Sequence, residues 1–188
     1  MQTISDLSGK LLIAMPDMGD SRFAGTVIYV CAHSDEGSMG LILNRPKPEI
    51  AFDKLLQQMK IPRSPACRDI RVHIGGPVER ARGFVLHSLD YKSDANTMEV
   101  ADNVGMTATQ DVLEALARGD GPTESLLALG YTGWGPGQLE EELADNGWLT
   151  GPAESRILFG DDHAGKWTAA LALLGVSPQA LSLTGGRA

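Results

Sequence analysis

Cys31 and His33 form the clearest pairing of a nucleophile with a base in this sequence. They stand two residues apart at the end of an apolar run, and on a β-strand that spacing places both side chains on one face. An imidazole beside a thiol is the arrangement that activates cysteine nucleophiles. The alternative is a buried free thiol with a histidine at the rim of the core. An enzymatic interpretation therefore requires a concave pocket that contains the pair.

A second candidate combines an amide, a guanidinium and a proline where an apolar run ends, at Asn44, Arg45 and Pro46. The planar fork of an arginine can bind a carboxylate or a phosphate. In the alternative, Asn44 hydrogen-bonds the turn that follows, and Arg45 pairs with a carboxylate on a neighbouring element. The candidate ligand-binding residues are Asn44, Arg45, Gly75, Gly76 and Trp134.

A glycine-rich segment lies between a predicted strand and a predicted helix, which is a position typical of phosphate-binding loops. It matches neither G-x-G-x-x-G nor G-x-x-x-x-G-K-[ST], it has no lysine, and three glutamates follow it. We favour an architectural turn, in which glycines let the backbone pass beneath Trp134 and Gln138 satisfies free backbone donors. The residues assigned to this structural motif are Gly130, Gly133, Gly135, Pro136, Gly137, Gln138 and Trp148.

The histidines and serines show no further catalytic or metal-binding pattern. Neither H-x-x-x-H nor H-E-x-x-H occurs, and no serine lies in a G-x-S-x-G elbow. His163 stands beside Asp161 and Asp162 and could be an oriented base, but its place at a predicted helix start favours a capping cluster. We therefore predict no metal site and no cofactor.

Composition indicates a globular, acidic protein. Its 188 residues are 43% hydrophobic and carry a formal net charge of -8, so the averaged surface repels phosphate backbones and anionic lipids. The most basic stretch, from Arg63 to Arg82, is interrupted by Asp69 and Glu79 and has no interleaved aromatic residues. We expect no membrane association and no direct binding of nucleic acid.

The cysteine content and the length add two expectations. Two cysteines without C-x-x-C spacing suit a reducing compartment, and the apolar run from Leu11 to Met15 lacks the features of an export signal, so we expect a cytoplasmic protein. The length predicts a single domain over residues 1–188. Its C-terminal tail after about residue 183 is expected to fray.

Short apolar runs bounded by turn residues predict strands, and 3.6-residue periodicity predicts four helices. The expected strands are Leu11–Pro16, Gly25–Ala32, Met39–Asn44, Ile70–Ile74, Gly83–Ser88, Thr97–Ala101, Glu124–Tyr131 and Arg156–Phe159. The expected helices run from Phe52 to Pro62, from a Thr107 cap to Gly119, from Pro136 to Asn146, and from an Asp162 cap to Gly175. The early connections are too short for parallel crossovers, so we predict an α+β fold with a mostly antiparallel sheet.

Three segments together resemble the bacterial YqgE/AlgH-like family: MGLILNRP at 39–46, GGPV at 75–78, and GYTGWGPGQLEEEL at 130–143 with Asn146 and Trp148 after it. The likeness extends over nearly the whole chain. It implies a branched, partly barrel-like antiparallel sheet surrounded by helices, in a cytosolic protein. Family members have no agreed enzymatic activity and supply no catalytic residues, although some carry the label of transcriptional regulator.

The leading hypothesis is therefore a non-catalytic binding or regulatory protein, with an unknown small molecule or protein as its partner. Two alternatives stay open. An enzyme acting on a small anionic metabolite would use Cys31 with His33, or Arg45 with nearby carboxylates. A direct DNA-binding regulator is implied only by the family label, because the sequence is acidic and has no helix-turn-helix pattern.

Overall fold

The computed structural model describes residues 6–93, 95–179 and 181. The chain forms two compact units, one made of the chain up to Asn44 together with the chain from Thr132 onward, the other of Arg45–Tyr131. Two such units can still unfold together, so the single-domain organisation stays a prediction. The tail after residue 183, for which fraying is expected, lies outside the described residues.

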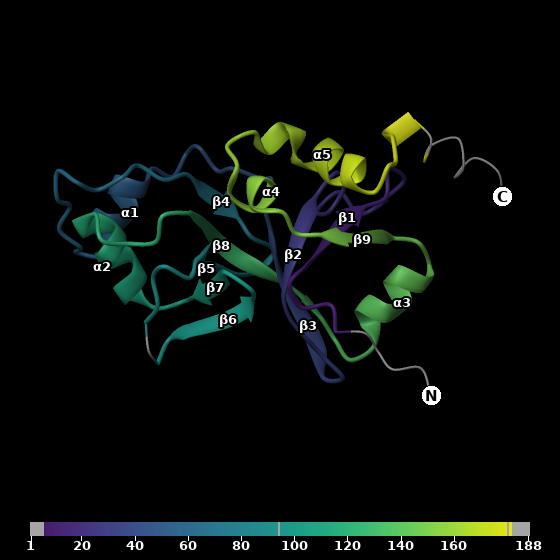
Figure 1. Cartoon of the computed structure of the whole chain (residues 1–188), viewed down its shortest axis with the longest axis horizontal. Helices are drawn as coiled ribbons and strands as arrows, with labels where there is room; N and C mark the ends of the chain where they lie inside the picture. The colour runs from purple at the N-terminus through teal and green to yellow at the C-terminus, as the bar shows by residue number, and fades with distance from the viewer. Residues whose placement is uncertain (1–5, 94, 180, 182–188) are drawn as a thin grey trace. The chain divides into compact units, whose positions relative to one another are not determined.

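The first unit is built on an antiparallel sheet, in which strand β1 pairs with β2 on one side and with β9 on the other (Figure 1). The strands are β9 (Trp148–Pro152), β1 (Lys10–Ala14), β2 (Val27–Ser34) and β3 (Gly37–Ile42), in that spatial order. The last residues of β8 (Ser125–Trp134) pair with β3. Lys10 is exposed and the other four residues of β1 are buried, as expected of a strand covered on both faces.

Helices cover this sheet. α3 (Gln138–Ala144) contributes Leu139 to a core with Leu12, Ile28 and Ile42. α4 (Ser155–Phe159) leads through a 3₁₀ turn (His163–Gly165) to α5 (Lys166–Leu173), which packs on β1 and β9. The apolar faces of these helices therefore bury the strands that the sequence marks as apolar on both sides.

The second unit pairs a mostly antiparallel sheet with two helices. Its strands are β6 (Thr97–Ala101), β7 (Val104–Thr107), β5 (Val78–Ser88) and the first part of β8, in spatial order, and β4 (Val72–Ile74) pairs parallel to β8. Phe52 and Leu56 of α1 (Phe52–Gln58) and Leu113 and Leu116 of α2 (Gln110–Arg118) share one core with Leu127. The predicted α+β class with a mostly antiparallel sheet is confirmed.

Several expected elements differ in the structure. Residues 156–159 were expected to form a strand but lie in α4, where the carbonyl of Glu154 accepts hydrogen bonds from the amides of Ile157 and Leu158. A short apolar run fits either structure, and periodicity cannot separate them. Strands β7 and β9 were not expected, and the described residues contain five α-helices instead of four. None of these helices has the length and apolarity needed to cross a membrane.

The expected cap of the second helix is also wrong. Thr107 is the last residue of β7, and α2 begins at Gln110 after Thr109, whose side chain makes no capping bond. The hydroxyl of Thr107 lies instead 2.8 Å from Nε2 of His87 and 2.8 Å from the hydroxyl of Thr97. A β-branched residue with polar partners on both neighbouring strands is therefore held in the sheet.

Lys166, the first residue of α5, is a buried cation with only carbonyl partners among the described residues. Its side chain is 2% exposed, and Nζ donates to the carbonyl oxygens of Leu43, 3.1 Å away, and Leu158, 3.4 Å away. Burial lowers the pKa of Lys166 from 10.5 to about 8, although the charge of Asp161 opposes the shift. The ammonium thus links Leu43, which follows β3, to Leu158 of α4, and this burial costs the free energy of desolvating the charge.

The stability contribution of Lys166 should grow as pH rises. Between about pH 8 and pH 10.5 the unfolded chain still binds the proton that the folded chain has released, so folding becomes more favourable with pH. Relative to Lys166→Met, wild type should gain about 2–3 kcal/mol in the free energy of unfolding between pH 7 and pH 10. Urea unfolding of both proteins at each pH measures this difference, and titration of Cys31 or Tyr29 affects both alike. A difference that does not change with pH would show an ordinary lysine pKa.

Candidate functional site

The side-chain amide of Asn44 is used to hold the backbone at the start of β2. Its Oδ1 accepts from the amide of Val27 at 3.0 Å, and its Nδ2 donates to the carbonyl of Gly25 at 2.9 Å. Asn44 therefore bonds the chain that enters a neighbouring strand, not the turn that follows it. Both polar ends of this amide have backbone partners, which supports a structural role.

Arg45, Gly75 and Gly76 come together in the second unit through their backbones. The carbonyl of Arg45 accepts a hydrogen bond from the amide of Ile74 at 2.8 Å, and Ile74 directly precedes Gly75. A β-carbon at Gly130 would collide with the carbonyl oxygen of Gly76, and Gly130 has φ of +78°. This close approach explains why glycine stands at 130. The other two candidates, Asn44 and Trp134, belong to the first unit, so the five predicted ligand-binding residues are divided between the units.

The glycine-rich segment is organised by the carboxylate of Glu142 in α3. Its Oε1 lies 3.0 Å from Nε1 of Trp148 and 3.4 Å from Nε1 of Trp134, so both indole N–H groups donate to one oxygen. Its Oε2 accepts from Nε2 of Gln138 at 3.0 Å, and Oε1 of Gln138 accepts from the amide of Gly135 at 3.0 Å. The chain of bonds links the turn, the helix and β9 within the first unit.

Both indoles are buried in this arrangement. Trp134 is 7% exposed and Trp148 is 3% exposed, and their rings meet edge to face with centroids 6.3 Å apart. Phe23 contacts Trp148 in the same way at 6.0 Å. Gly137 precedes α3 with φ of +73°, a conformation that favours glycine. The polar atoms of the segment are thus turned toward each other, which supports the architectural interpretation.

Cys31 and His33 do not share the environment that the two-residue spacing suggests. The pairing of β2 with β3 shifts between Val30 and Ala32, so a bulge at Cys31 breaks the alternation of faces. Burial raises the pKa of the Cys31 thiol to about 12, which keeps it protonated at neutral pH. The thiol is therefore a core group.

The partners of His33 are Ser38 and Glu140, which sequence reasoning missed. Nδ1 of His33 lies 2.7 Å from Oγ of Ser38, and Nε2 lies 3.1 Å from Oε1 of Glu140. The turn between β2 and β3 has only two residues, so Ser38 is the direct cross-strand neighbour of His33. A strict two-residue hairpin would have predicted that neighbour. Glu140 could not have been found, because its position depends on how α3 packs.

The other histidines serve internal hydrogen bonding or packing. His87 is fully buried, with Nδ1 2.9 Å from the carbonyl oxygen of Ser88 and Nε2 beside Thr107, and burial lowers its pKa. At the start of the 3₁₀ turn that precedes α5, a carboxylate oxygen of Asp162 accepts from the amide of Gly165 at 3.1 Å, so Asp162 caps this turn and not α5 itself. Among the described residues, no three histidine, cysteine, aspartate or glutamate side chains are placed to hold a metal ion.

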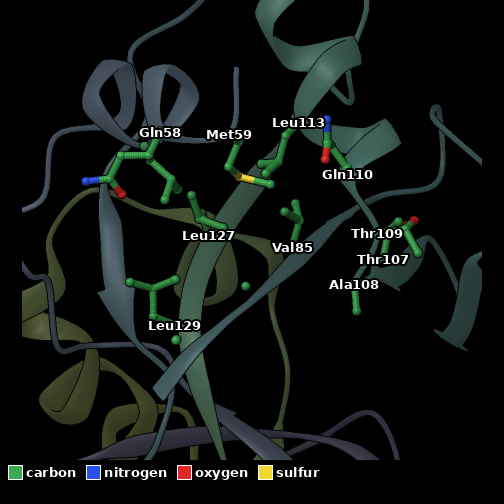
Figure 2. A pocket seen from close by; sticks show the side chains of 13 residues that line it. Gln58, Met59, Val85, Thr107, Ala108, Thr109, Gln110, Leu113, Leu127 and Leu129 are labelled. Atoms are coloured by element: carbon green, nitrogen blue, oxygen red, sulfur yellow. The ribbon is translucent and has the colours of Figure 1, made fainter. Parts of the chain in front are cut away.

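A pocket of about 290 Å³ lies in the second unit, between α1, α2 and the sheet. Figure 2 shows Met59, which directly follows α1, and Leu113 of α2 beside Val85 and Leu127 of the strands. The full lining is Leu55, Gln58, Met59, Ala81, Gly83, Val85, Thr107, Ala108, Thr109, Gln110, Leu113, Leu127 and Leu129. None of these side chains ionises near neutral pH, so the pocket offers apolar contact and a few neutral polar groups.

Replacing Trp148 by alanine should lower the free energy of unfolding by about 3–5 kcal/mol, because a buried indole and its hydrogen bond to Glu142 are both lost. Trp148→Phe is the matched control, since it keeps most of the apolar area and should lose about 1–2 kcal/mol. Urea unfolding measures both. A Trp148→Ala midpoint equal to that of wild type would mean that the ring contributes nothing to folding.

Comparison with known proteins identifies the family. A family model described as AlgH-like matches residues 11–179. A UPF0301 protein of Cereibacter sphaeroides is 57% identical over 183 residues, covering 97% of this chain and 100% of that protein. A UPF0301 protein of Rhodospirillum rubrum is 50% identical over 182 residues, covering 97% of this chain and 94% of that protein.

Solved structures agree with this match. The solution structure of the AlgH protein from Pseudomonas aeruginosa has a TM-score of 0.79 at 43% identity, covering 100% of this chain and 97% of that one. The crystal structure of a Corynebacterium diphtheriae protein has a TM-score of 0.70 at 21% identity, covering 91% and 88%, and shows the same fold. The sequence resemblance to the YqgE/AlgH-like family is confirmed, and the chain belongs to the AlgH-like family.

Proposed function

We propose that this AlgH-like protein is a cytoplasmic binding protein that holds a small, uncharged and largely apolar ligand in the pocket of its second unit. The observation that carries the proposal is the lining: apolar side chains from two helices and a sheet, joined by threonines and glutamines, without an ionisable group. Apolar walls with a few neutral polar groups are typical of small-molecule sites.

The composition of the pocket also separates binding from catalysis there. General acid–base catalysis needs a titratable side chain within hydrogen-bond reach of the substrate. The lining supplies none, and the hydroxyl of Thr109 contacts the carboxylate of Asp111. A small anionic metabolite, which the alternative hypothesis requires, would meet no cation in this pocket. The lining therefore favours an uncharged ligand.

Direct DNA binding receives little support from the arginines of the second unit. Arg68 donates to the carbonyl oxygens of Pro122 and Thr123, and Arg82 lies 3.5 Å from the carboxylate of Glu79. These guanidinium groups already have partners, and the formal net charge of the chain is -8. A regulatory role would then act through the bound ligand or a protein partner. Two unpaired cysteines, both buried, suit the proposed cytoplasmic setting.

Indole is a suitable probe, because it is uncharged, apolar and carries one hydrogen-bond donor. In a titration followed by methyl NMR, the resonances of Met59, Leu113 and Leu127 should shift together and saturate. Indole-3-carboxylate, with the same ring and a negative charge, should bind at least about tenfold more weakly, since burying an unpaired charge is unfavourable.

Gly83→Leu should block the pocket. A β-carbon at Gly83 would meet the side chains of Leu127 and Leu129 at ordinary contact distances of 3.7 and 3.9 Å, so a larger side chain extends into the lining without a backbone clash. We expect this variant to weaken indole binding at least about tenfold. Gly19→Leu, where a β-carbon meets open space in the first unit, is the matched control. Wild type without saturable shifts, or equal affinity in Gly83→Leu, would refute the proposed site.

A further inference from the structure

We propose that Ser38, His33 and Glu140 form a second, chemically active site that transfers acyl groups from small uncharged esters to Ser38 and then to water. This inference goes beyond the binding function, because it uses other residues in the first unit. In it Ser38 is the nucleophile, His33 the general base, and Glu140 a positioning residue that acts through His33.

The distances match those required of an activated hydroxyl. Oγ of Ser38 lies 2.7 Å from Nδ1 of His33, and Oε1 of Glu140 lies 3.1 Å from Nε2 on the other side of the ring. A nucleophile within hydrogen-bond reach of a base, which is itself oriented by a third group, is the general signature of such sites. The two ring nitrogens exchange the roles that they have in chymotrypsin-like triads, where the serine faces Nε2.

Burial separates the base from solvent while the nucleophile remains accessible. The side chain of His33 is 2% exposed, that of Glu140 is 31% exposed, and Ser38 is partly exposed at the start of β3. Within the described residues, Nε2 of His33 has no aligned hydrogen bond despite its short distance to Glu140. A buried polar atom in this state calls for an explanation, and catalytic hydrogen bonds often align only when substrate is bound.

The proton follows the contacts already present. With the carboxylate of Glu140 favouring a proton on Nε2, Nδ1 is free to accept the Ser38 proton as Oγ attacks the ester carbonyl carbon. The bond between that carbon and the alkoxy oxygen breaks, and His33 gives its proton to the departing alcohol. Water then loses a proton to His33 and attacks the acyl carbon, the bond to Oγ breaks, and Ser38 regains its proton as the carboxylic acid leaves.

The surroundings select the charge of the substrate. Asp35 and Glu36 form the exposed turn between β2 and β3. Together with Glu140 these carboxylates disfavour an anionic acyl donor. The ester is therefore uncharged, and p-nitrophenyl acetate is a suitable probe.

The test combines a fluorophosphonate probe with turnover of p-nitrophenyl acetate. The probe should form one covalent adduct, located on Ser38 by peptide mass spectrometry, as Oγ displaces fluoride from phosphorus. Ser38→Ala should form no adduct and show no turnover above background. Ser34→Ala, in the same hairpin and bonded only to the amide of Glu36 in the described chain, should react as wild type does.

Substitutions of His33 and Glu140 should change kcat in ways that a purely structural role would not. His33→Gln should lower kcat at least about 100-fold, and Glu140→Gln at least about tenfold with KM unchanged, while circular dichroism shows both folded. Glu140→Asp should restore part of kcat. Absence of an adduct in wild type, an adduct that persists in Ser38→Ala, or wild-type kcat in folded His33→Gln would each overturn the proposal. Because indole binding is measured at other residues, its failure and this one are distinguishable.

Discussion

The carboxylate of Glu142 is the group on which the most characteristic segment of this protein depends. Two buried indole N–H groups and the amide of Gln138 converge on its two oxygens. An indole N–H that is buried without an acceptor costs about 1–3 kcal/mol, so this acceptor favours the burial of Trp134 and Trp148 in the arrangement observed. The position of α3, the turn before it and the start of β9 are thereby set together.

This dependence explains how much of the fold was predictable. Periodicity located α1, and Gly119 located the end of α2, because those signals are local, whereas α3 ends at Ala144 and not at Asn146. The sequence also marked Gln138 and Trp148 as parts of one structural motif, with the backbone passing beneath Trp134. It could not show that Glu142, and not its neighbours Glu140 and Glu141, accepts from both indoles, since three consecutive glutamates look alike until the helix is docked. Residues 156–159 were wrongly predicted as a strand for a related reason. A run of four residues is too short to show whether its hydrophobic periodicity is that of a helix or of a strand.

The candidate sites divide in the same way, into residues that have a local sequence signal and residues whose position depends on tertiary packing. Asn44, Arg45 and the glycine pair were found because they interrupt apolar runs, yet Asn44 is occupied with backbone groups and the glycines with close packing. The pocket of the second unit has no motif at all, because its lining comes from five separate elements that are individually ordinary apolar segments. His33 was noticed, but with the wrong partner, since a bulge at Cys31 cannot be read from alternation. Trp134, Leu139 and Trp148 of the glycine-rich segment thus face the core, and the pocket lies elsewhere in the chain.

Hydrogen exchange of the Trp148 indole N–H tests the central claim most directly. If Glu142 holds this proton inside the core, the N–H exchanges only when the protein unfolds globally, and its free energy of exchange equals the free energy of unfolding measured with urea. An exchange rate close to that of a free indole, under conditions where the backbone amides of β1 remain protected, would contradict the claim. The segment from Gly130 to Trp148 would then be an accessible surface and not an internal support.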